Sequence, residues 1–230
     1  MISIVNPELV STGVALIATG LFIVLLIAGE RVVMKAMGNT FFNQPKTETE
    51  LRRLLKTHNV PLKEWGQGKA KVVNSLWEEI QNGESTLLSN PLRRRVSTVS
   101  LIIRRGDHIL IEKEQRLKDG RVRQRHIPPS EKLQRDENYL QAAYRGLQEE
   151  LNILPEDASF KLDTHNVRTI QQPSNSYPGL LAEYHIHTIE VDIPNLPQHQ
   201  FSTEEMDASN GQEAKSHVWD WSYPPPNFSH

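Results

Sequence analysis

An uncharged run of 21 residues near the N-terminus constrains this chain more than any other feature. From Leu9 to Gly29 the sequence reads LVSTGVALIATGLFIVLLIAG and contains no charged side chain. As a helix, 21 residues rise roughly 31 Å, which is enough to cross the hydrocarbon core of a bilayer. The preceding residues, MISIVNPE, lack the basic start of a secretory signal peptide. The run therefore predicts one uncleaved transmembrane helix over residues 9–29.

The charges on either side of this run predict its orientation. Only Glu8 is charged before it, whereas five basic residues follow it: Arg31, Lys35, Lys46, Arg52 and Arg53. By the positive-inside rule, residues 1–8 lie outside and the rest of the chain is cytoplasmic, so the lipid bilayer is an expected partner. The absence of cysteine fits a reducing compartment. We expect a single-pass membrane protein with a juxtamembrane linker over residues 30–50.

Residues 51–90 have the spacing of two short helices. A capping residue at Thr47 or Thr49 precedes the first helix, and Gly83 ends the second. Apolar residues recur at helical spacing in both: Leu51, Leu54 and Leu55, then Val72, Val73, Leu76, Trp77 and Ile80. A DNA-binding helix-turn-helix has a similar outline, but the net charge of -2 argues against a general nucleic-acid binder. We interpret 51–90 as a small helical segment and expect no nucleic-acid partner.

Residues 93–223 alternate between strand and helix patterns. Two β-rich runs flank Arg105, Gly106 and Asp107, which predicts a hairpin. Further strands are predicted at residues 120–128, 167–173, 179–194 and 214–221, with one amphipathic helix over 138–151. This order indicates a mixed α/β domain with its helices packed on a sheet. The three consecutive prolines in residues 224–230 rule out regular structure in the tail.

The predicted helix over residues 138–151 carries the candidate chemistry. Its apolar residues recur at steps of three and four, which predicts a buried stripe of Leu140, Ala143, Leu147 and Leu151. Positions 146, 149 and 150 share a small patch, because they are related as i, i+3 and i+4. Carboxylates at all three would converge on one divalent cation, and Mg²⁺ prefers oxygen ligands. Here Glu149 and Glu150 are acidic, while position 146 is a glycine.

The register around this helix resembles the box of the Nudix hydrolases. Glu137 is followed by seven residues and then by RGLQEELNI, with Arg145 and the paired glutamates in place, aliphatic residues at Leu147 and Ile153, and Pro129 upstream. The resemblance covers roughly residues 95–222 and implies a Nudix-like α/β/α sandwich around a mixed sheet. It also implies that Glu149 and Glu150 bind Mg²⁺, that Arg145 orients them and that Glu137 supports the site.

The departures from this pattern bear on activity. Ser130 and Glu131 stand where the family has paired glycines, and Asn152 replaces the glycine that ends the helix. Gly146 replaces the first glutamate of the box, so one implied metal ligand is missing. Mg²⁺ often binds through one or two carboxylates when substrate phosphates complete its coordination. We therefore expect at most a weak Mg²⁺ site, at Glu149 and Glu150.

Three functions follow from these observations. The first is a membrane-anchored Nudix-like domain that binds a nucleotide-type ligand or a protein partner, with reduced or no hydrolase activity. The second is an active Mg²⁺-dependent hydrolase of a nucleoside diphosphate linked to another moiety, with Glu204 or Glu205 as the general base. The third is a docking subunit of a membrane complex.

Several other polar residues have ordinary interpretations beside functional ones. Arg121, Arg123 and Arg125 alternate along one strand, as a solvated face or as a diphosphate-binding row. The basic run Arg93 to Arg95 is expected to be solvated, with attraction to anionic lipid as the second interpretation. We interpret His185 and His187 as ordinary strand residues, and Trp219 and Trp221 as packing residues.

Overall fold

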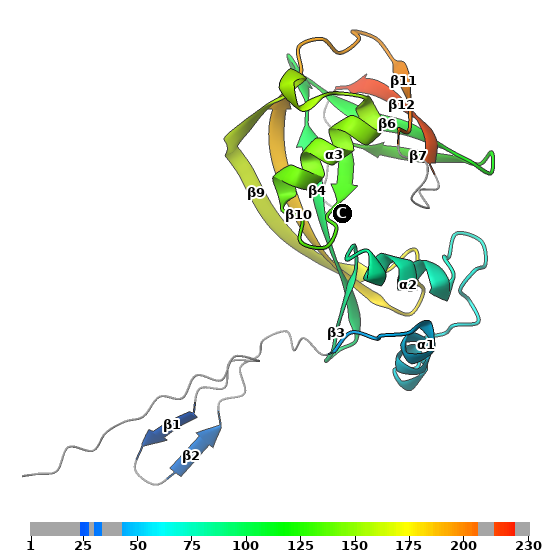
Figure 1. The fold of residues 1–230 in the computed structure, drawn as a ribbon, viewed down its shortest axis with the longest axis vertical. Helices are drawn as coiled ribbons and strands as arrows, with labels where there is room; N and C mark the ends of the chain where they lie inside the picture. The colour runs from blue at the N-terminus through cyan, green and yellow to red at the C-terminus, as the bar shows by residue number, and fades with distance from the viewer. Residues whose placement is uncertain (1–23, 28–29, 34–42, 207–213, 224–230) are drawn as a thin grey trace, which may run out of the picture.

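The computed structural model describes residues 24–27, 30–33, 43–206 and 214–223 (Figure 1). The predicted transmembrane helix, residues 9–29, lies mainly outside this part of the chain. Its described portion, Val24–Ile27, is strand β1, which pairs antiparallel with β2, Glu30–Val33, so these four residues are extended and not helical. In the part of the chain that the structure describes, no helix is long and apolar enough to cross a membrane. Residues 1–8 and the tail 224–230 also lie outside it.

The two predicted short helices form as α1, Glu48–Thr57, and α2, Val73–Gln81. The Oγ1 atom of Thr47 accepts a hydrogen bond from the backbone N–H of Glu50, which identifies Thr47 as the cap of α1. Both helices bury apolar residues in one cluster, which also contains Tyr177 and Leu180 from the loop before β10. The helical segment therefore packs on the main domain.

The main domain contains two five-stranded sheets. The first has the order β3-β4-β10-β9, with β8 paired to β4. Its strands are β3, Thr86–Leu88; β4, Arg93–Ile102; β8, Ser130–Lys132; β9, Ser159–Pro173; and β10, Leu181–Asp192. Because β4 and β10 run parallel while the other pairs are antiparallel, this sheet is mixed.

The second sheet has the order β11-β12-β6-β5, with β7 paired to β6. Its strands are β5, Arg104–Arg105; β6, His108–Leu117; β7, Val122–Ile127; β11, Phe201–Glu204; and β12, Ala214–Ser222. The predicted hairpin at Gly106 forms only between β5 and β6. The prediction that the two long β-rich runs form this hairpin was wrong. Strand β4 pairs with β10 in the first sheet, and the chain changes sheet at Ile103.

Helix α3, Tyr139–Leu151, packs between elements of both sheets. Its buried residues are Ala142, Ala143, Gly146, Leu147 and Leu151, and they share a core with Leu101 of β4, Ile189 of β10 and Trp219 of β12. The predicted stripe is thus confirmed except at Leu140, which is half-buried. The fold is mixed α/β, but with two sheets where the sequence predicted one. Within the described part of residues 93–223, α3 is the only α-helix, beside a 3-10 turn at Pro155–Asp157.

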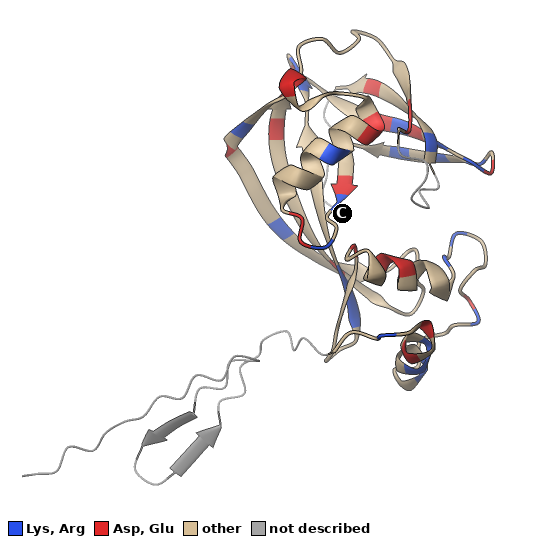
Figure 2. Cartoon of the chain, viewed as in Figure 1, with Lys and Arg blue, Asp and Glu red and all other residues tan. Residues whose placement is uncertain are grey.

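The basic run at the start of β4 is buried and not solvated. Arg94 binds the buried carboxylate of Glu79 on α2, with an Nη2–Oε2 distance of 2.7 Å. Arg93 and Arg95 both bind Glu183 of β10, at 2.9 and 2.6 Å. Figure 2 shows this basic stretch of β4 beside the acidic residues of α2. The prediction of a solvated entry was wrong, because these guanidinium groups join the helical segment and β10 to β4.

Candidate functional site

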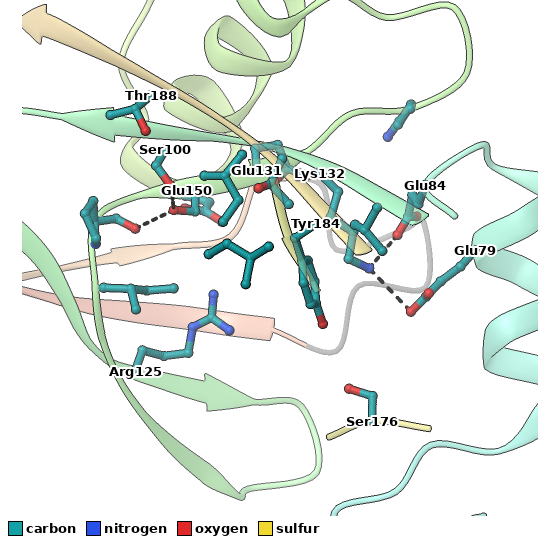
Figure 3. Close-up of a pocket in the computed structure, with 18 of the residues that line it drawn as sticks. Glu79, Glu84, Ser100, Arg125, Glu131, Lys132, Glu150, Ser176, Tyr184 and Thr188 are labelled. Carbon is teal, nitrogen blue, oxygen red and sulfur yellow. Dashed lines mark hydrogen bonds and ion pairs between the residues drawn. The ribbon is translucent and has the colours of Figure 1, made fainter. Parts of the chain in front are cut away.

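A cavity of about 1440 Å³ lies against the face of the first sheet that points away from α3. Alternate residues of the central strands line it: Val96, Thr98, Ser100 and Ile102 on β4, and Tyr184, Ile186 and Thr188 on β10. The opposite wall includes Lys71, Ser75 and Glu79 from the helical segment, and β7 adds Arg123 and Arg125. Figure 3 shows side chains from these separate elements around one space. The helical segment is therefore part of the cavity wall.

Three carboxylates meet at one end of this cavity. Glu149 and Glu150 come from the last turns of α3, and Glu131 comes from β8. Figure 3 shows Glu131 and Glu150 close to each other on the wall. We call Glu131, Glu149 and Glu150 the acid site. Sequence reasoning identified Glu149 and Glu150 but missed Glu131, although Glu131 and Gly146 were both noted as departures from the family pattern.

Arg145 holds most of the carboxylates around the acid site. Its Nε and Nη2 atoms donate to the two oxygens of Glu137, at 2.9 and 3.0 Å. Its Nη1 atom lies 3.2 Å from Glu149 and 3.1 Å from Glu131. Nη2 also donates to the backbone carbonyl of Lys132, at 2.7 Å. One guanidinium therefore joins α3, β8 and the loop that carries Glu137, and it occupies an oxygen of Glu149 and of Glu131.

Position 146 is enclosed by the side chain of Glu131. Gly146 is buried in α3, and a Cβ atom added there would lie 2.9 Å from Cβ and 3.4 Å from Cγ of Glu131. Burial raises the pKa of Glu131, and the charge of Glu149 adds to this, although Arg145 opposes both. The Glu131 side chain thus occupies the space that a longer residue at 146 would need.

A buried histidine lies behind the acid site, between two more carboxylates. The Nδ1 atom of His217, on β12, lies 2.7 Å from Glu112, and its Nε2 atom lies 2.6 Å from Glu205. Burial alone would lower the pKa of His217, but the hydrogen bonds to Glu112 and Glu205 and the charge of Glu150 raise it to about 10. His217 is therefore an imidazolium that donates from both nitrogens. We call Glu112, His217 and Glu205 the histidine clamp.

Of the two predicted general bases, Glu204 and Glu205, only Glu205 belongs to the histidine clamp. Glu205 is buried with its carboxylate on His217, whereas Glu204, its neighbour in the chain, is exposed at the end of β11. The other member of the clamp, Glu112, also accepts from the Nε atom of Arg125 at 2.8 Å. Sequence reasoning missed Glu112 and His217, because they pair across β6 and β12 and lie 105 residues apart. The structure brings Glu205 near Glu150, and leaves Glu204 at the surface.

Two features of the acid site bear on Mg²⁺ binding. Glu149 is held by Arg145, and position 146 supplies no ligand. Burial raises the pKa of Glu150 well above its usual range, and the charges of Glu131, Glu112 and Glu205 raise it further, although the charge of His217 opposes them. Among the residues that the structure describes, no three or more His, Asp or Glu side chains are placed to hold a metal ion.

The other residues singled out in the sequence lie in different parts of the structure. Arg121 is exposed and bound to Asp119, whereas Arg123 and Arg125 line the cavity. The ring of His187 stacks with those of His165 and Tyr139, as one layer at the start of α3. Trp219 is fully buried and packs in the core, and Trp221 lies against the guanidinium of Arg105. The packing interpretation of the tryptophans is confirmed.

Comparison with known proteins gives a likeness of fold. No family model matches the chain, and no curated relative does. A Caenorhabditis elegans Ap4A hydrolase matches in a binary complex with 20% identity and a TM-score of 0.29, and in a second structure with 22% and 0.30; each match covers 54% of this chain and 77% of the other. A Nudix hydrolase from Nitrosomonas europaea matches with 22% identity and a TM-score of 0.27, over 41% of this chain and 57% of the other. Over about half of its length, the chain is structurally similar to Nudix hydrolases.

Proposed function

We propose that this protein is a membrane-anchored, Nudix-like module that binds a nucleotide-type ligand in the cavity and hydrolyses it little or not at all. One observation carries the proposal. Arg145 holds both Glu149 and Glu131, and a side chain at position 146 has no room, so the acid site offers a divalent cation few free oxygens. The cavity itself, at about 1440 Å³, exceeds the common size range of small-molecule sites, roughly 300–1,000 Å³.

The chemistry of the lining supports a phosphorylated ligand. Arg123, Arg125 and Arg168 all line the cavity, and a guanidinium group can bind phosphate oxygens in a bidentate manner. The ring of Tyr184 lies on the same sheet face, where an aromatic surface suits a planar base. A bilayer anchor in the apolar N-terminal segment belongs to the same proposal.

The test uses the full-length chain and a panel of nucleoside diphosphate compounds, ADP-ribose among them. Calorimetry measures binding, and product analysis with Mg²⁺ or Mn²⁺ measures hydrolysis. We expect binding with little or no turnover. Arg123→Ala is expected to weaken binding, whereas Arg121→Ala leaves it unchanged, because Arg121 is exposed on the same segment and bound to Asp119. Robust turnover that Glu149→Gln abolishes would overturn the proposal.

The active Mg²⁺-dependent hydrolase is a second candidate, and one observation favours it. Burial raises the pKa of Glu131 and of Glu150, and a neighbouring carboxylate raises each further: Glu149 acts on Glu131, and Glu131 acts on Glu150. A divalent cation delivered with substrate phosphates would relieve this repulsion. The same panel decides between the two candidates, because the second predicts turnover that depends on Glu149 and Glu150.

A further inference from the structure

Glu131 on β8 faces Gly146 on α3, and the Cβ of Glu131 fits only because position 146 has no Cβ. We infer that Glu131 takes over, in volume and in charge, the place that a side chain at position 146 would occupy in the acid site. Glu131 is then a positioning residue. A side chain can be introduced at position 146 only when residue 131 loses its own Cβ. The consequence for catalysis rests on the proposed function, whereas the packing relation stands without it.

The atom of Glu131 that would meet a side chain at position 146 cannot rotate away. A Cβ at position 146 would lie 2.9 Å from the Cβ of Glu131, and the position of a Cβ is fixed by its backbone. The backbone of β8 is held by β4, through the pairing of Glu131 with Val99 and the hydrogen bond from Leu133 to the carbonyl of Ser97, at 2.9 Å. The facing side of α3 is fixed by the core residue Leu147. Neither element is free to retreat, so one of the two positions must lack a Cβ.

The Glu131 carboxylate lies between two hydrogen-bond donors, on Arg145 and on Lys132. Its Oε1 atom lies 3.1 Å from Nη1 of Arg145 and accepts a hydrogen bond from the backbone N–H of Lys132, at 2.9 Å. The carboxylate therefore lies beside Arg145, the residue that precedes Gly146 on α3, and near the charges of Glu149 and Glu150. A glutamate at position 146 in addition to Glu131 would add a fourth carboxylate to the acid site. A glutamate at 146 in place of Glu131 would keep the number at three.

A double-mutant cycle separates volume from charge. The variants are Gly146→Ala, Glu131→Ala, Glu131→Gly and the two double variants of Gly146→Ala, with the melting temperature of the full-length chain as the measurement. The φ of Gly146 is not in the left-handed region, so alanine in this helix would ordinarily raise stability. We expect Gly146→Ala to lower the melting temperature by about 3 °C or more. Glu131→Gly is expected to recover this loss, and Glu131→Ala is not, since alanine keeps the Cβ.

A second set tests the charge. Gly146→Glu alone is expected to melt lowest, because it adds both the Cβ contact and a fourth carboxylate. Glu131→Gln/Gly146→Glu removes the extra charge but keeps the Cβ contact, so it is expected to recover only in part. Glu131→Gly/Gly146→Glu removes both, and is expected to recover most and to gain Mg²⁺-dependent hydrolysis of ADP-ribose that Gly146→Glu lacks.

The outcomes separate the two levels of the inference. If Gly146→Ala melts at or above the original chain, or if Glu131→Ala rescues it as well as Glu131→Gly does, the pairing is wrong. If the melting temperatures follow the pairing and the exchanged variant gains no turnover, the substitution in charge is wrong. If the original chain already turns over substrate, the proposed function fails while the melting results still decide the pairing.

Discussion

The Nε2 atom of His217 lies 2.6 Å from an oxygen of Glu205, and both side chains are buried. A buried carboxylate is stable only when it is paired and hydrogen-bonded. Glu205 obtains its partner from the adjacent strand, and His217 in turn donates to Glu112 through its other nitrogen. The imidazolium therefore donates one hydrogen bond to each of two buried carboxylates behind the acid site.

His217 makes stability depend on pH in the alkaline range. The clamp raises its pKa from 6.5 to about 10. Because the folded pKa lies above the unfolded one, the contribution is complete below pH 6.5 and is lost as the pH rises toward 10. We expect the free energy of unfolding, measured with urea at pH 6, 8 and 10, to decline over this interval.

The variant His217→Gln provides the matched comparison. It leaves Glu205 buried without its cation and Glu112 with Arg125 alone, which is expected to cost about 3–5 kcal/mol at pH 6. The alkaline decline should then disappear. Glu204→Gln, at the exposed neighbouring position, is the control and should behave like the original chain. An unchanged pH profile in His217→Gln would show that another group titrates.

Glu79 gives the opposite dependence in acid. Burial alone would raise its pKa, but the charges of Lys132, Arg94 and Lys71 and a hydrogen bond from Ser85 lower it to about 2. Because the folded pKa lies below the usual 4.5, this contribution is present above pH 4.5 and is lost as the pH falls toward 2. At about 1.4 kcal/mol for each pKa unit, the loss is on the order of 3 kcal/mol.

The measurement for Glu79 is urea unfolding between pH 7 and pH 2. Glu79→Gln should lose stability at pH 7 and flatten the acid decline, because Arg94 remains buried beside it without its carboxylate. Glu78→Gln is the matched control, since Glu78 is exposed and its carboxylate accepts a hydrogen bond from Asn74. Equal effects of the two variants would contradict the assignment.

Asn152 tests the end of the α3 helix. Its φ of 58° and ψ of 33° place it in the left-handed region, and its N–H donates to the carbonyl of Leu147. Asparagine adopts this region more readily than most residues that carry a Cβ. Glycine adopts the region without a Cβ penalty, whereas alanine does not. We expect Asn152→Gly to be neutral or slightly stabilising and Asn152→Ala to cost about 1 kcal/mol in urea unfolding. Equal stabilities would argue against this cap.

Local patterns in the sequence were sufficient for the parts of the fold that depend on neighbouring residues. The stripe of α3, the cap at Thr47 and the hairpin turn at Gly106 all follow from spacings of a few residues. The register from Glu137 to Glu150 likewise placed Arg145 where it contacts Glu137 and Glu149.

Contacts between distant strands were beyond such patterns. The burial of Arg94 depends on Glu79 on α2, and the clamp depends on the pairing of β6 with β12. A basic run has the same local appearance whether solvated or buried, so the sequence favoured the solvated interpretation for Arg93 to Arg95. The isolated His217 was not singled out. Glu131 was missed for a related reason. Its contact with Gly146 joins a strand to a helix, and only their packing shows that two substitutions compensate each other.

Arg145 joins three carboxylates and a backbone carbonyl, so its shape matters as much as its charge. The planar guanidinium reaches Glu137 with two nitrogens while Nη1 reaches Glu131 and Glu149. Lysine offers one compact ammonium and cannot bind in this forked manner. We expect Arg145→Lys to lower the free energy of unfolding by about 2 kcal/mol, whereas Arg121→Lys, at an exposed pair, changes it by less than about 0.5 kcal/mol.

The same variant tests whether Arg145 limits cation binding at the acid site. Releasing Glu131 and Glu149 from the guanidinium frees carboxylate oxygens toward the cavity. Mn²⁺ titration followed by electron paramagnetic resonance should therefore show tighter binding in Arg145→Lys than in the original chain, provided that circular dichroism confirms a folded protein. If Mn²⁺ binds more weakly after the substitution, then Arg145 orients the carboxylates for a metal instead of competing with it. That result would favour the active hydrolase over the binding module.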